Sequence, residues 1–181
     1  MTRTFVALLI LTLAGCRTTT QTRYLHKNAD LGVINKVAVL NFENLTAERS
    51  AGDKVQKIFY LELLSLDVFE LAEPGQVAKL VRSTEALTPA DYQKLGKDLA
   101  VDGIFIGSVV DYAEGRSGTT PAPEVTLQVR LIETSSGTTI WSAGETRSGA
   151  SAATRLFGLG GESLTEAARR VVREILQTML K

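Results

Sequence analysis

The side chains most often used in catalysis are sparse in this 181-residue chain, which has one histidine, His26, and one cysteine, Cys16. A Ser-His-acid triad needs its histidine held against a nucleophile, and His26 lies in a polar segment without hydrophobic periodicity. A soft metal site needs several cysteine or histidine ligands, and one of each does not make a set. The sequence therefore predicts no hydrolytic triad, no metal and no cofactor.

Carboxylates offer the one enzymatic alternative. Asp98, Asp102 and Asp111 bracket a predicted strand, and paired carboxylates are the acid and base of glycosidases. A cell-wall or glycan hydrolase would use them in this way. Aspartates at helix and strand ends are also common solvated residues, and no histidine, cysteine or metal ligand accompanies these. We therefore expect a protein that is not an enzyme.

A glycine-rich segment from Gly158 to Ser163 precedes the last predicted helix and superficially resembles a phosphate-binding loop. It lacks the lysine and the hydroxyl residue at P-loop spacing, so a flexible lead-in to the helix is the simpler interpretation. The surrounding loop also carries Leu156, Phe157 and Leu159. These side chains either fold back onto the core or stay exposed for a partner or a lipid. They are the candidate partner-binding residues.

The N-terminal residues predict export. Arg3 supplies a positive start, residues 5–13 form a short apolar run, and small residues precede Cys16, as a secretory signal requires. The run is about half of the roughly 20 residues that span a bilayer as a helix. The sequence Leu-Ala-Gly-Cys ending at Cys16 resembles a bacterial lipobox, which implies cleavage before Cys16 and lipidation of its thiol. Arg17, which is not acidic, then implies transport to the outer membrane. An ordinary signal peptide with a chance cysteine is the alternative.

The chain divides into three predicted segments: a signal peptide over residues 1–15, the lipidated cysteine and a polar tether over residues 16–32, and one domain over residues 33–181. The tether is threonine-rich and lacks periodicity. Formal net charge is zero, which gives no footprint for nucleic acid and no polybasic membrane patch. With the single cysteine lipidated, packing and not a disulfide must hold the domain.

Hydrophobic patterning predicts an α/β (α+β) fold, with elements in the order βαβααβββα around a mixed sheet that is parallel early and an antiparallel meander late. The predicted strands cover residues 36–42, 68–72, 104–112, 125–131 and 138–143, and the predicted helices begin at residue 48 or 52 and at residues 74, 89 and 163. Residues 113–123 and 148–161 are predicted to be loops.

Two burial patterns follow from these elements. The central strand should bury Ile104, Ile106 and Val109. The first long helix should carry a buried stripe of Val55, Ile58, Phe59, Leu61 and Leu64, and the last helix one of Leu164, Ala168, Val171, Val172, Ile175, Leu176 and Met179.

Three stretches resemble the CsgG-like family of outer-membrane lipoproteins, which is related to LpoB-type penicillin-binding-protein activators. They are Lys36 to Thr46, Leu99 to Ser108, and the hairpin from Val125 to Ser142 with Gly137 in its turn. The resemblance covers most of residues 36–180 and implies a lipoprotein domain for envelope assembly or export, without catalytic residues. Curli-secretion channels of this family insert two long membrane hairpins per subunit. Residues 113–123 are too short for such a pair, so we do not expect this chain alone to build a pore.

The sequence thus predicts a non-enzymatic outer-membrane lipoprotein on the periplasmic face, acting as an assembly or secretion accessory through protein–protein binding. Its expected partners are the membrane through the lipid anchor, a periplasmic or outer-membrane protein, and further copies of itself, with no nucleic acid. A penicillin-binding-protein activator that regulates peptidoglycan synthesis is the alternative. That role requires reach across the periplasm, and the short tether counts against it.

Overall fold

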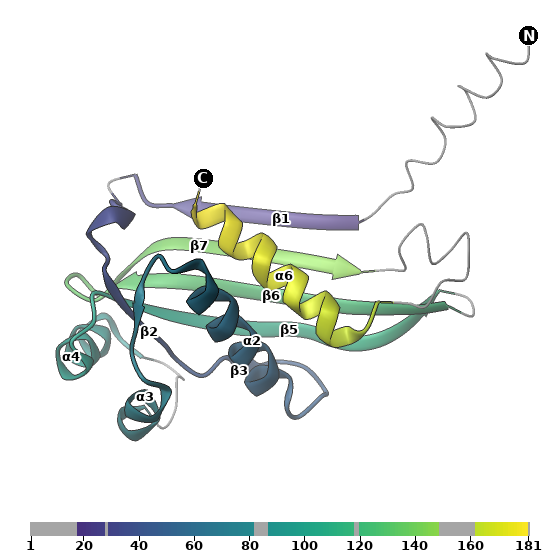
Figure 1. Ribbon diagram of the computed structural model, residues 1–181, viewed down its shortest axis with the longest axis horizontal. Helices are drawn as coiled ribbons and strands as arrows, with labels where there is room; N and C mark the ends of the chain where they lie inside the picture. Colours follow the sequence, from purple (N-terminus) through teal and green to yellow (C-terminus); the bar gives the residue numbers. More distant parts are fainter. Residues whose placement is uncertain (1–17, 28, 82–86, 118–119, 149–161, 181) are drawn as a thin grey trace, which may run out of the picture.

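The computed structural model describes residues 18–27, 29–81, 87–117, 120–148 and 162–180, and one seven-stranded mixed sheet organises them (Figure 1). Its strands are β1 (Thr18–Leu25), β2 (Lys36–Val39), β3 (Glu43–Asn44), β4 (Glu70–Leu71), β5 (Gly103–Ser117), β6 (Thr120–Glu133) and β7 (Thr138–Ser148). The helices are the short 3-10 turn η1 (Leu31–Val33), α2 (Ala51–Leu66), α3 (Pro74–Leu80), α4 (Pro89–Leu99) and α6 (Leu164–Met179). The predicted mixed α+β class is confirmed.

Across the sheet the strand order is β1-β7-β6-β5-β2-β4, with β3 beside β5. β2 lies parallel to β4 and β5, and β3 lies parallel to β5. From β5 onward the pairing is antiparallel, through β6 and β7 to β1, although β1 comes first in the chain. The predicted parallel beginning and late meander are both present, and β1 extends the meander by one strand.

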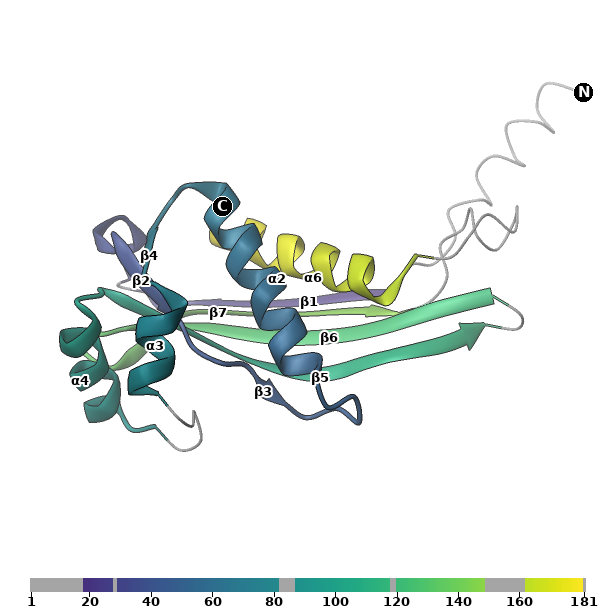
Figure 2. The same cartoon turned by 60° about the horizontal axis from the view of Figure 1, so that its bottom comes forward.

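Helices α2 and α6 pack against each other on one face of the sheet (Figure 2). The strands send every second side chain toward them, because side chains alternate between the two faces of a strand. Phe105 lies in this core, with its ring centroid 5.3 Å from that of Phe59 and 6.2 Å from that of Trp141. The α6 stripe is buried from Ala168 onward, as predicted, and Leu164 is half-buried.

On the other face, α3 and α4 cover only the end where β2 and β5 begin (Figures 1 and 2). The second apolar cluster takes Ala38, Leu40, Ile104 and Ile132 from the sheet and Tyr92, Leu95 and Leu99 from α4. Since Val37 and Val39 face the first core, β2 is buried on both faces. No helix of the described segments covers the rest of this side of β5, β6 and β7, which we call the open face.

Local chemistry explains where α4 begins and how β6 turns into β7. Thr88 caps α4: its hydroxyl oxygen accepts the amide of Asp91 at 3.3 Å, and the Asp91 carboxylate accepts the amide of Thr88 at 2.8 Å. Gly137, at φ +71°, closes the β6–β7 turn, where a Cβ would lie 2.4 Å from the carbonyl oxygen of Pro89. A side chain there would be strained and would collide with the start of α4.

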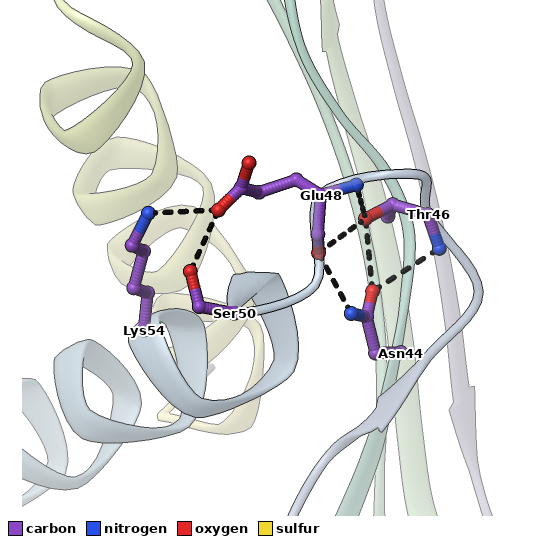
Figure 3. A network of polar contacts seen from close by, with 5 residues as sticks. All are labelled: Asn44, Thr46, Glu48, Ser50 and Lys54. Atoms are coloured by element: carbon purple, nitrogen blue, oxygen red, sulfur yellow. Dashed lines mark hydrogen bonds and ion pairs between the residues drawn. The ribbon is translucent and has the colours of Figure 1, made fainter.

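Helix α2 begins differently, because the side chain of Ser50 makes no capping bond. A polar network fixes the loop ahead of it instead (Figure 3). Asn44 Oδ1 accepts the hydroxyl of Thr46 at 2.9 Å, and Asn44 Nδ2 donates to the carbonyl oxygen of Glu48 at 2.8 Å. Glu48 Oε1 accepts from Ser50 Oγ at 2.6 Å and pairs with Lys54 Nζ at 3.1 Å, and these bonds lower the pKa of the Glu48 carboxyl. The network therefore fixes the loop between β3 and α2 and the position at which α2 begins.

The tether predicted for residues 16–32 is wrong over Thr18–Leu25, which form β1. Its ladder with β7 runs from Thr18 opposite Ser148 to Leu25 opposite Trp141. From Thr20 to Leu25 the side chains are exposed on both faces, so the strand has no apolar alternation to reveal it. Threonine's strand preference is the remaining signal. The sheet therefore begins well before the predicted domain boundary at residue 33.

The loop predicted for residues 113–123 is also wrong, because β5 and β6 continue there as a hairpin that extends past the helices (Figure 2). Ser117 pairs with Thr120 at its tip. Pro121 and Pro123 suggest a loop from sequence, yet β7 pairs with β6 only as far as Glu124. Beyond that point β6 has a neighbour on one side alone among the described residues, and a strand tolerates proline in such a place.

The burial predictions were right in part. Ile104 and Val109 are fully buried, whereas Ile106 is half-buried at the groove described below. On α2, Leu61 and Leu64 are 62% and 51% exposed. The buried stripe instead follows positions four residues apart: Ala51, Val55, Phe59 and Leu63.

Candidate interaction site

The sequence-predicted site residues lie outside the described part of the chain. Cys16 and the loop residues Leu156, Phe157 and Leu159 all fall in segments that the structure does not describe. Lipidation and loop binding therefore stay predictions. Within the described segments, no helix combines the length and the apolar character needed to cross a membrane.

The three aspartates do not form a common site. Asp102 Oδ2 accepts hydrogen bonds from the backbone amides of Asn35 and Lys36, each at 3.0 Å, and so ties the start of β2 to the start of β5. Asp98 is exposed on α4, and Asp111 is exposed where β5 bulges past Val109. Among the described residues, no three acidic, histidine or cysteine side chains are placed to hold a metal ion.

A buried group of charges lies where β1, β7 and α6 meet. Arg147 on β7, 6% exposed, has its Nε 3.2 Å from Glu162 Oε2 and its Nη1 3.5 Å from Glu174 Oε1. Glu145, two residues earlier on β7, faces the same way and is 1% exposed. Neither of its carboxylate oxygens has a hydrogen-bond partner among the described residues. Gln21 of β1 closes the group, with its Nε2 3.5 Å from the main-chain oxygen of Glu174.

The environment of Glu145 favours its neutral form. Burial, and after it the nearby carboxylate of Glu174, raise the pKa of Glu145 to about 7. Gln21 and Arg147 act in the opposite direction but do not cancel these effects. An uncharged carboxyl is the less costly species in such a place, because an unpaired buried carboxylate loses its hydration without compensation.

The open face carries a groove of about 430 Å³ at the middle of β5 and β6, beside α4. It is lined by Asn41, Glu43, Leu87, Tyr92, Ile106, Gly107, Ser108, Gln128, Arg130 and Ser142. Ser108 Oγ donates to Glu43 Oε2 at 2.8 Å, which occupies part of that carboxylate. The sequence predicts this wet face of β6 from the alternation of Gln128 and Arg130 with apolar residues. The predicted alternation does not show the groove, which also depends on α4.

The two edges of the sheet are open over long stretches (Figure 1). β1 pairs with β7 on one side, and no described strand pairs with its other side. Its side chains contribute to neither apolar cluster, and Tyr24 and Leu25 are 50% and 40% exposed. At the opposite edge, β2 and β3 cover β5 only as far as Val109. Over residues 110–117, β5 is paired with β6 alone within the described segments.

Several solved structures have a fold similar to that of this chain. The structure of PelC from Paraburkholderia phytofirmans, a dodecamer, superposes with a TM-score of 0.62 at 21% identity, covering 88% of this chain and 95% of PelC. The fold is similar to that of PelC. Lipoprotein GNA1162 from Neisseria meningitidis gives a TM-score of 0.56 at 13% identity, over 81% of this chain and 98% of its own. At such identities the similarity to PelC and GNA1162 is one of fold.

No family model and no curated protein matches the sequence. The C-terminal domain of LpoB from Escherichia coli is a more distant structural match, with a TM-score of 0.47 at 16% identity over 77% of this chain. That likeness is too weak to carry an argument. The resemblance to the CsgG-like family accordingly stays a prediction, while the likeness to lipoprotein folds is observed.

Proposed function

We propose that this protein is a lipid-anchored envelope protein that acts without catalysis, through binding to proteins, as an assembly of its own copies. The observation that carries the proposal is the PelC-like fold over 88% of the chain, since that PelC is a dodecamer. The open sheet edges offer a means of assembly, and the separated aspartates offer no catalytic pair. Outer-membrane attachment through Cys16, on the periplasmic face, completes the proposal.

The position of β1 makes the proposed anchor short. A lipidated Cys16 would be separated from Thr18, the first residue of the sheet, by Arg17 alone. At about 3.3 to 3.6 Å per residue, this link spans roughly 7 Å. The domain would then rest at the membrane surface, which suits an accessory for assembly or secretion at that membrane.

The oligomeric state tests the proposal. The full-length protein, extracted in mild detergent, is measured by light scattering and by chemical cross-linking. We expect one defined assembly that persists on dilution. A monomer at every concentration would remove self-assembly from the proposal. The variant Cys16→Ala should leave the membrane fraction, and continued sedimentation with membranes would show that another element anchors the protein.

Activation of a penicillin-binding protein remains the second candidate function. A domain held within about 7 Å of the outer membrane would meet only an enzyme that itself extends that far. Adding the purified protein to a bifunctional penicillin-binding protein and measuring peptidoglycan cross-linking separates the two candidates. A faster reaction supports the activator, and an unchanged rate together with a stable assembly supports the accessory.

A further inference from the structure

The two open edges of the sheet are similar in length. β1 offers the edge of residues 18–25, and β5 offers the edge of residues 110–117. Each presents backbone N–H and C=O groups without a strand partner among the described residues. Such groups form a template for another strand, because a backbone edge gains hydrogen bonds when it is paired.

The β1 edge lacks the features that usually prevent pairing. Its sequence, Thr-Thr-Thr-Gln-Thr-Arg-Tyr-Leu, has no proline and no lysine, and its ladder with β7 has no bulge. Natural proteins normally protect an edge of this length with such features. An eight-residue strand with strand-favouring threonines, a single charge and none of these other features is suited to pairing.

Charge distinguishes the two edges and makes them complementary. β1 carries the exposed Arg23 and no acidic residue, whereas the open part of β5 carries the exposed Asp111 and Glu114, with Arg116 next to its end. The strand registers put Arg23 on the helix-covered side, opposite Ala143, and Glu114 on the same side, opposite Pro123. If one sheet continued into another, Arg23 and Glu114 would thus lie on the same face.

The direction of the strands also fits a contact between copies. Within one sheet β1 runs antiparallel to β5, because each of the three steps from β5 to β1 is antiparallel. When a second copy extends the sheet in the same orientation, its β5 meets β1 in antiparallel fashion. All N-terminal ends then point the same way, as lipid anchors in one membrane require. Antiparallel pairing of β1 with β1 would direct the two N-terminal ends in opposite directions.

We propose that the free edge of β1 pairs antiparallel with residues 110–117 of β5 in a second copy of this chain. This rests on the proposed self-assembly and adds the surface through which it occurs. The contact is head-to-tail, since one patch meets a different patch, and repeated head-to-tail contacts close into rings when the rotation allows. Arg23 and Glu114 contribute specificity, because opposite charges favour the right register and like charges oppose it.

Cross-linking with introduced cysteines tests the pairing. The changes Thr22→Cys on β1 and Ala113→Cys on β5 place thiols on exposed positions of the same face. Two differently tagged full-length variants, each with one change, are mixed and treated with a short bismaleimide. We expect a product that contains both tags and little product from either variant alone. Lys57→Cys on the exposed side of α2 is the matched control and should not couple to either position. The unsubstituted protein shows how much cross-linking arises through Cys16 alone.

A charge exchange tests specificity by a second route. Arg23→Glu alone and Glu114→Arg alone each bring like charges together at every contact, so both variants should assemble at least tenfold more weakly. In an equimolar mixture each copy meets an opposite charge on both sides, and assembly should return.

The outcomes separate the pairing from the proposed function. An assembly that forms without the mixed cross-link, or a mixture that fails to recover, overturns the edge pairing while self-assembly stands. Cross-linking of Thr22→Cys to itself alone would show β1–β1 pairing instead. A chain that remains monomeric in every form overturns both.

Discussion

The sheet packs against its helices in two contrasting ways. One region lies under α4, which we call the apolar end, and the other lies where β1, β7 and α6 meet, which we call the charged end. At the α4 end, Ile104 and Ile132 pack against apolar helix residues. Where β1, β7 and α6 meet, β7 instead buries Glu145 and Arg147 on the side of the sheet that α6 covers, beside a strand whose side chains are exposed. Apolar burial stabilises by about 25 cal/mol per Å², whereas buried charges recover little beyond their desolvation. The comparison teaches that apolar contacts alone hold α4 to the sheet, whereas the region around β1 also buries charged groups that must be compensated.

The largest effect should come from the apolar end. Ile104 is fully buried in the second apolar cluster, so Ile104→Ala should lower the free energy of unfolding by about 2 to 5 kcal/mol. Ile106→Ala is the matched control, because Ile106 is half-buried at the groove and should lose clearly less. Urea unfolding measures both. Equal losses would mean that the groove is closed in solution and that the two ends are more alike than the structure indicates.

The charged end should respond next to the loss of its cation. Arg147→Met leaves Glu162 and Glu174 without their shared partner, and we expect a loss of about 3 kcal/mol in unfolding free energy. Arg173→Met is the control, since Arg173 is exposed and its pair with Glu62 is screened by solvent, so this loss should be clearly smaller. A near-zero effect of Arg147→Met would show that Arg170, whose Nε lies 2.9 Å from Glu162 Oε1, and solvent compensate these carboxylates.

The free energy of unfolding should also depend on pH through a group at the charged end. The pKa of Glu145 is raised from 4.5 to about 7 in the fold, so its proton contributes stability that is fully present below about pH 4.5. That contribution is lost as the pH rises through 7, and it amounts to at most about 3 kcal/mol. Urea unfolding between pH 4.5 and 8 should show this loss in the native protein. The variant Glu145→Gln removes the titration, and a pH dependence that matches the native protein would contradict the assignment.

Helix caps should give the smallest and most equal effects. Thr88→Ala removes the cap of α4, and Ser163→Ala removes the hydroxyl that accepts the amide of Glu166 at 3.2 Å on α6. Each substitution should lower the free energy of unfolding, measured by thermal unfolding, by about 1 kcal/mol. The effect is local, so it should not depend on whether the end is apolar or charged. A loss several times larger at one helix would show that its cap also supports distant packing.

The apolar end and the stripe of α6 could mostly be predicted from sequence, because their signals are local. Thr88, Pro89 and Asp91 mark the start of α4 through their own chemistry, and the apolar stripe of α6 follows the helical period. The alternation of β6 likewise gave its buried and wet faces. In each case the residue types and their spacing carry the structural information without help from distant contacts.

The charged end could not be predicted in the same way. The side chains of β1 are exposed on both faces, so its sequence shows no hydrophobic periodicity. Its place beside β7 depends on contacts between residues that are far apart in the chain. The buried charges had a weak signal, since Trp141, Ala143, Glu145 and Arg147 continue one alternation. The predicted strand ends at residue 143 and therefore excludes Glu145 and Arg147, which continue the buried positions of β7. Their burial requires α6, which no local pattern could place.

Amide hydrogen exchange of the full-length protein, compared between dilute monomer and concentrated assembly, tests the central claim most directly. The account predicts that residues 18–25 and 110–117 gain protection together on assembly, by tenfold or more, because both edges acquire hydrogen bonds. Residues 89–99 of α4 should exchange equally in the two states. Assembly that leaves both edges unchanged, or that protects α4 instead, would contradict the claim that this protein assembles through the edges of its sheet.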